Sequence, residues 1–134
     1  VGAERAGRTG DTPMAGDGGY LTTHVLDTAQ GVPAAGLRIE LFRLNGDARI
    51  TLGEFTTNVD GRTDAPVLSA EDFTLGTYEL VFHAGAHIAK SGATLPEGVF
   101  LDAVPIRFVI SDPAAHYHVP LLLSPYGYAT YRGS

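Results

Sequence analysis

The chain has 134 residues, a formal net charge of −6 and no cysteine. This length fits one domain with a real hydrophobic core. The acidic balance argues against a nucleic-acid partner, because phosphate contacts need a concentrated positive surface. The missing cysteines exclude a disulfide framework, a thiol nucleophile and a thiolate metal site.

Neither a membrane segment nor a leader is visible in the sequence. No apolar run approaches the roughly 20 residues that span a bilayer. The N-terminal stretch also lacks the apolar core of a signal peptide. We therefore expect no membrane partner and a cytoplasmic location.

The first residues differ in composition from the rest of the chain. Residues 1–19 are rich in glycine, alanine and charge without periodicity, and predict a flexible N-terminal arm. From Tyr20 onward, β-branched and aromatic residues alternate with polar ones. We therefore expect one folded domain over residues 20–134.

The remaining chain alternates between strand patterns and turn signals. Turn chemistry includes Asn45-Gly46-Asp47 and Val59-Asp60-Gly61-Arg62, and Pro105 predicts an edge position or a strand start. Residues 84–91 are the one helix candidate. Strands are expected over 20–26, 37–44, 48–57, 66–68, 77–82 and 103–110, with two more in 116–134 joined at Ser124-Pro125. Seven or eight short strands with one short helix predict an all-β, antiparallel β-sandwich.

The histidines are the first candidates for chemistry. On a strand, His116 and His118 project to the same face, and His24 lies on another strand with polar flanks. Such a cluster fits a general base at neutral pH, and it also fits a zinc site with an open position. No acidic residue completes a metal set, so we favour the metal-free alternative. His83 and His87 stand four apart in the helix candidate and are expected on an exposed face.

Two arginines lie near other candidate residues. Arg62 follows a turn, where it is either an exposed loop residue or a clamp for anions and carbonyl oxygens. Arg132 could act in the same way, or it could pair with an acid or the terminal carboxylate. Alternation places Tyr126 and Tyr128 on one face and Tyr131 on the other, so the three cannot all line one pocket.

Three stretches resemble one known family. They are Leu21–Thr28 (LTTHVLDT) with the following GVPA turn, then Asp60-Gly61-Arg62, then His116–Ser134, which ends in Tyr-Arg-Gly-Ser. In order and spacing they resemble the 5-hydroxyisourate hydrolases, the transthyretin-related proteins of purine catabolism. The match covers about residues 20–134. Its most specific part is the C-terminal signature.

The resemblance implies a transthyretin-like sandwich assembled as a homotetramer, a dimer of dimers with active sites where the two dimers face each other. It also implies an enzyme of urate degradation, a cyclic amide hydrolase. This enzyme opens the ring of 5-hydroxyisourate to give 2-oxo-4-hydroxy-4-carboxy-5-ureidoimidazoline, with no cofactor and no metal. The alternative is a transthyretin-like binding protein for a small, hormone-type molecule, without catalysis. The family's locations leave periplasm and peroxisome open beside the cytoplasm.

The family's functional residues fall on matching positions of this sequence. The resemblance implies catalytic roles for His24, Arg62 and His118. It implies substrate-binding roles for Tyr131, Arg132, Gly133 and Ser134. One departure is the pair Gly127 and Ala129, which stand where the family commonly has serines and so lack two hydroxyls of the family's pattern. His116 receives no role.

Overall fold

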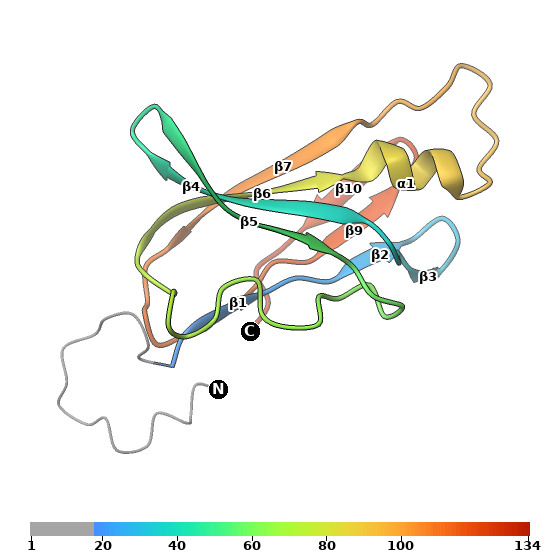
Figure 1. Ribbon diagram of the computed structural model, residues 1–134. Coiled ribbons are helices and arrows are strands. Elements are labelled where there is room, and N and C mark those ends of the chain that lie inside the picture. Colours follow the sequence, from blue (N-terminus) through green and yellow to red (C-terminus); the bar gives the residue numbers. More distant parts are fainter. Residues whose placement is uncertain (1–17) are drawn as a thin grey trace, which may run out of the picture.

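The structure is a computed structural model that describes residues 18–134 (Figure 1). The predicted arm therefore lies outside the described residues, except for Gly18 and Gly19. Gly19 is buried, and its N–H donates to the carbonyl oxygen of Pro113 over 3.1 Å.

Two β-sheets pack face to face, as predicted for a sandwich (Figure 1). The first sheet has the order β5-β4-β6-β7 and is antiparallel throughout. Its strands are β4 (Arg38–Asn45), β5 (Ala48–Thr56), β6 (Gly76–His83) and β7 (Ala103–Ile110). Strand β7 lies at the edge of this sheet, which is where Pro105 was expected, because proline has no N–H to donate to a further strand.

The second sheet is built from the two ends of the domain. It has the order β10-β9-β2-β3, and the neighbouring pair β1-β8 continues it. Its strands are β1 (Tyr20–Thr22), β2 (Val25–Asp27), β3 (Val32–Pro33), β8 (His116–His118), β9 (Leu121–Ser124) and β10 (Gly127–Thr130). The pairings β1-β8 and β2-β9 run parallel, whereas β2-β3 and β9-β10 are antiparallel.

Strands β1 and β2 are one strand with a short interruption, and so are β8 and β9. The interruption between β8 and β9 includes Pro120, because proline has no N–H to donate to a neighbouring strand. The partners nevertheless stay in step, since the N–H of Val119 donates to the carbonyl oxygen of Thr22 and the N–H of Leu121 to that of His24. Counted as continuous strands, these pairs bring the total to the upper end of the seven or eight predicted.

The core fills the space between the sheets. Burial alternates strictly from Tyr20 to Asp27, with Leu21, Thr23 and Val25 facing inward. The largest wholly buried side chains come from both sheets, from the residue before β4 and from the loop before β6; they are Tyr78, Phe73, Phe82, Leu21, Leu37, Ile39, Leu41, Leu80, Ile110, Leu121, Leu123 and Val25.

The single helix of the described residues is α1 (Ala84–Lys90), which follows β6 directly. It buries Ala84, Gly85 and Ile88 against the sandwich. Residues 66–68 differ from the prediction, because they make only an isolated bridge between Leu68 and Leu21. No helix among residues 18–134 is long and apolar enough to cross a membrane.

Phe73 gives a test of how the loop before β6 is held. Its ring is fully buried and lies 5.8 Å from the ring of Tyr117 on β8. Phe73→Ala should lower the free energy of unfolding by about 3–5 kcal/mol, because it leaves a cavity under the loop. Urea unfolding followed by circular dichroism measures this change. Val59→Ala is the control, since Val59 is 82% exposed, and it should shift stability by less than about 0.5 kcal/mol.

Candidate active site

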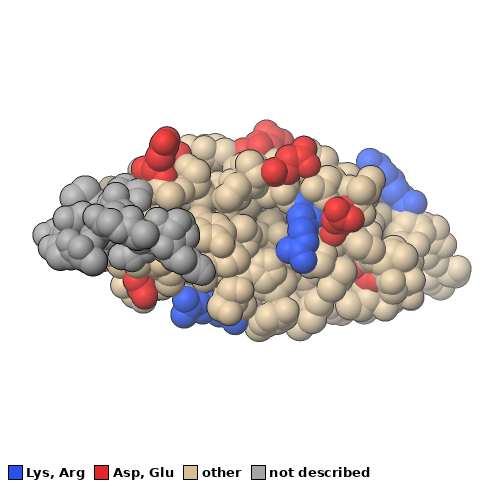
Figure 2. All heavy atoms as spheres, turned by 90° about the horizontal axis from the view of Figure 1, so that it is seen from below, with Lys and Arg blue, Asp and Glu red and all other residues tan. Residues whose placement is uncertain are grey.

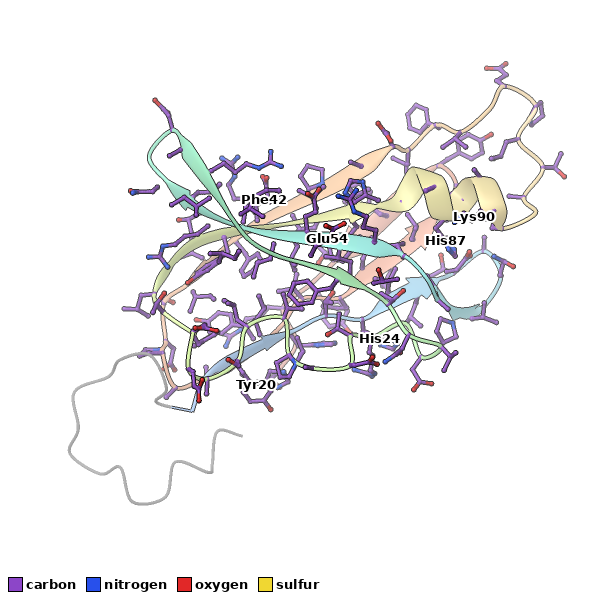
Figure 3. All side chains as sticks on the ribbon, in the orientation of Figure 1. Tyr20, His24, Phe42, Glu54, His87 and Lys90 are labelled. Carbon is purple, nitrogen blue, oxygen red and sulfur yellow. The ribbon has the colours of Figure 1, made fainter. Side chains whose placement is uncertain are left out.

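The outer face of β1-β2 carries the first site residue. Tyr20, Thr22 and His24 alternate with the buried core residues, so they point away from the core. Figure 3 shows Tyr20 and His24 along the same layer of the sandwich, away from His87 and Lys90 of α1.

Strand β8 adds two more histidines to this face. The parallel register places Tyr20 beside His116 and Thr22 beside His118. The Thr22 hydroxyl lies 2.6 Å from Nε2 of His116 and 2.8 Å from Nδ1 of His118. Residues nearly a hundred positions apart in sequence are therefore in direct hydrogen-bond contact.

Arg62 reaches the same face through a tight turn. It forms an isolated antiparallel bridge with His24, and the carbonyl oxygen of Gly61 accepts from the N–H of Val25 over 2.8 Å. Gly61 has a positive φ of 75°, and a Cβ there would lie 2.4 Å from the carbonyl oxygen of Val25. Only glycine fits this close approach, which explains why glycine precedes Arg62.

The C-terminal residues close one side of the site. The N–H of Gly133 donates to the carbonyl oxygen of His118 over 2.7 Å. A Cβ on Gly133 would lie 3.0 Å from Cδ2 of His118, so the absent side chain lets the terminal segment lie against this histidine. Ser134 then reaches a cavity of about 480 Å³, which is also lined by Thr22, Arg62, His116 and His118.

The surroundings of the three histidines favour their neutral form. Burial is the main cause that lowers the pKa of His118, and the charge of Arg62 lowers it further. Burial and Arg62, in that order, also lower the pKa of His24, against smaller opposing contributions from Asp60. Burial lowers the pKa of His116 as well. Neutral imidazoles beside a fixed cation can accept protons at neutral pH.

Tyr131 and Arg132 do not line the cavity. The side chain of Tyr131 is 57% exposed. The guanidinium of Arg132 lies 4.1 Å from the ring centre of Tyr117, in a cation–π contact. Of the terminal four residues, Ser134 lines the cavity and Gly133 lies against His118. The contacts predicted for all four with substrate stay predictions.

Sequence reasoning gave no role to several residues that line this cavity. Thr22 and Tyr20 come from β1, and the segment 63–66 follows Arg62. Alternation does place Thr22 on the face of His24. Its contact with His116 and His118 depends on the parallel pairing of β1 with β8, and no local sequence pattern predicts that pairing.

The other two histidines have a different setting from the one expected. His83 ends β6 rather than lying in α1, and its Nε2 is 2.8 Å from a carboxylate oxygen of Glu40. Nε2 of His87 is 2.9 Å from a carboxylate oxygen of Asp27. The predicted exposed face is wrong, because each ring is largely covered and paired with an acid.

No metal-ligand arrangement is present in the part of the chain that the structure describes. Among residues 18–134, no three His, Cys, Asp or Glu side chains are grouped as metal ligands would be. The two histidines of β8 instead share the hydroxyl of Thr22.

Comparisons with known proteins show the family and the fold of this chain. The model of the HIUase/Transthyretin family matches residues 21–133. A curated relative named 5-hydroxyisourate hydrolase, from Mesorhizobium japonicum, is 62% identical over 118 residues, which are 88% of this chain and 94% of the relative.

Solved structures extend the likeness to three dimensions. The 5-hydroxyisourate hydrolase of Klebsiella pneumoniae has a TM-score of 0.72 and 37% identity, covering 87% of this chain and 99% of that one. Transthyretin from Sparus aurata has a TM-score of 0.75 at 23% identity, covering 84% of this chain and 95% of that one, and shows the shared fold alone. With a family model matched along nearly the whole described domain, this chain belongs to the HIUase/Transthyretin family.

Proposed function

We propose that this chain is a hydrolase that opens the ring of 5-hydroxyisourate. The observation that carries the proposal is the convergence of His24, His118 and Arg62 on one face, in a chain 62% identical to a relative named for this activity. The product expected from this ring opening is 2-oxo-4-hydroxy-4-carboxy-5-ureidoimidazoline.

The residue types fit the steps of the reaction. Water attacks a carbonyl carbon of the ring, forming a C–O bond and later breaking the ring C–N bond. We assign His118 as the base that takes the water proton, because its imidazole is held neutral. The guanidinium of Arg62 stabilises the negative charge that develops on the carbonyl oxygen. His24, beside Arg62, orients the water, and the proton held by His118 is then available to the leaving nitrogen.

The terminal four residues complete the proposed site. Ser134 lines the cavity and Gly133 lies against His118, which supports the substrate-binding roles proposed for both. Tyr131 keeps a largely exposed ring that can contact a substrate or a neighbouring subunit. Arg132, whose guanidinium packs on Tyr117, also holds the segment in place.

The activity is tested by the ultraviolet decay of 5-hydroxyisourate that urate oxidase generates in situ. Adding the protein should accelerate the decay beyond its spontaneous rate. His118→Ala should lower kcat by about 10²–10⁴-fold, because the base is lost. Arg62→Ala should lower it by about 10²–10³-fold, because the developing charge is no longer stabilised.

The control for these variants is His83→Ala, which removes a half-buried histidine from the other sheet and should keep full activity. An unaltered decay rate with the wild-type protein would contradict the enzyme and leave the small-molecule binding protein as the better reading. Full turnover in either site variant would contradict the role assigned to that residue.

The charge of Arg62 also predicts a pH effect. Burial and then this charge lower the pKa of His118 from its ordinary value of 6.5, so the basic form of His118 persists below that pH and is lost only as the pH falls through the lowered pKa. Arg62→Ala removes a repelling cation, so the pKa of His118 should rise. Titration of the His118 C2–H resonance by NMR in both proteins measures this shift. A pKa that stays the same or falls in the variant would contradict the electrostatic link.

We further propose a homotetramer built as a dimer of dimers. The candidate site lies on an outer face of the second sheet, which a facing subunit would enclose. Strands β7 and β10 are sheet edges, and unpaired edges invite pairing with another chain. Exposed apolar or aromatic side chains lie at or near these edges, including Val109, Tyr126 and Tyr128. Figure 2 shows acidic and basic side chains scattered over this face, with uncharged surface between them.

Light scattering after size exclusion should give about four times the chain mass of 14.1 kDa. Val109→Glu places a charge on the β7 edge and should reduce that mass, because a buried unpaired carboxylate disfavours association. Ile50→Glu, on β5 at the opposite edge of the same sheet, is the matched control and should leave the mass unchanged. A monomeric wild-type protein at assay concentration would rule out the assembly.

A further inference from the structure

The hydroxyl of Thr22 joins two histidines that lie on the neighbouring strand. Its oxygen is 2.6 Å from Nε2 of His116 and 2.8 Å from Nδ1 of His118. Both distances are those of normal hydrogen bonds. The mechanism proposed above assigns a role to His118 but none to Thr22 or His116.

His116 is held in one orientation by a second contact. Its ring stacks on the ring of Tyr20 with centroids 4.1 Å apart and planes only 9° from parallel. The register of β1 against β8 sets this pair side by side, next to the pair formed by Thr22 and His118. The stacking fixes the plane of the His116 ring, and in that plane Nε2 lies within hydrogen-bond distance of the Thr22 hydroxyl.

The number of protons limits how these three groups can bond. A threonine hydroxyl has one proton, and a neutral imidazole has one N–H. If Thr22 donates to Nδ1 of His118, the ring proton of His118 sits on Nε2, and that nitrogen cannot accept another. If His118 instead donates its Nδ1–H to Thr22, Nε2 of His118 keeps its lone pair and can accept a proton. Thr22 can then donate its own proton to Nε2 of His116, or accept a second bond from it.

We propose that Thr22 and His116 are positioning residues that hold His118 as the Nδ1–H tautomer, so that Nε2 faces the reacting water as the base. This inference rests on the proposed hydrolysis and deepens it. The physical reason is that the hydrogen bond made by one ring nitrogen decides which nitrogen carries the proton. In a serine protease, a carboxylate holds the catalytic histidine in the required tautomer. Here the Thr22 hydroxyl, which is also hydrogen-bonded to His116, has that role.

The tautomer can be measured directly. In protein labelled with ¹⁵N-histidine, the shifts of Nδ1 and Nε2 report which nitrogen of His118 is protonated. The wild type should show Nδ1–H. Thr22→Val keeps the shape and removes the hydroxyl, so His118 should move toward Nε2–H. The kcat for 5-hydroxyisourate should fall at least ~10-fold, while KM changes less than about 3-fold.

Three further variants separate this role from simple loss of structure. Thr22→Ser restores the hydroxyl and should restore both the tautomer and most of the kcat. His116→Phe keeps a ring to stack on Tyr20 but removes Nε2, and it should shift His118 in the same direction as Thr22→Val. Thr28→Val removes a hydroxyl that bonds to Leu123 far along the sheet, and it should change neither measurement.

Several outcomes would overturn the proposal. An Nε2–H tautomer in the wild type contradicts it, and so does an unchanged tautomer in Thr22→Val. A Thr22→Ser protein as impaired as Thr22→Val would show that the hydroxyl is not the active feature. If the wild type fails to accelerate decay of the substrate, the proposed function fails, whereas the ¹⁵N shifts still decide the tautomer.

Discussion

The parallel pairing of β1-β2 with β8-β9 is the constraint on which the site depends. It joins the first strands of the domain to nearly the last, and it sets Thr22 beside His118 and Val25 beside Leu121. A slip of one residue would turn each side chain to the opposite face. The inward side chains Leu21, Tyr117 and Leu121 are buried and prevent that slip, so core packing fixes the geometry of the polar face.

Two glycines then bring other parts of the chain up to this face. Gly61 allows its turn to bond to β2, and Gly133 allows the terminal segment to bond to β8. In both places a side chain would collide with backbone or with His118 itself. Close backbone approach, rather than any side-chain contact, is therefore what places Arg62 and Ser134 beside the histidines.

The two groups of histidines show how surroundings decide the role of a residue type. Nε2 of His83 contacts a carboxylate oxygen of Glu40 on β4, and Nε2 of His87 contacts one of Asp27 on β2, so each ring links two elements of the fold. At the cavity, His116 and His118 share the hydroxyl of Thr22, and burial lowers the pKa of both rings, with the charge of Arg62 lowering that of His118 further. The same side chain is structural in one place and a candidate base in the other.

Much of the fold could be predicted because its signals are local. Alternation identified β4, and β-branched and aromatic content identified the strand that begins at Tyr20. Turn residues identified the hairpin between β4 and β5. Residues 66–68 were harder to predict. Their short apolar run resembles that of a strand, but they form only one isolated bridge, from Leu68 to Leu21. The setting of His83 was also missed, since its acid partner Glu40 lies on another strand.

The sequence by itself determined the two-faced strands, the turns and the list of side chains able to do chemistry, because backbone preference and alternation act over a few residues. Resemblance to a family added the roles expected of His24, Arg62 and His118. Only the tertiary structure decided which strands pair in parallel, which polar faces meet, and that one threonine hydroxyl links two histidines. Those features depend on contacts between segments nearly a hundred residues apart, and no local pattern encodes the partner across that distance.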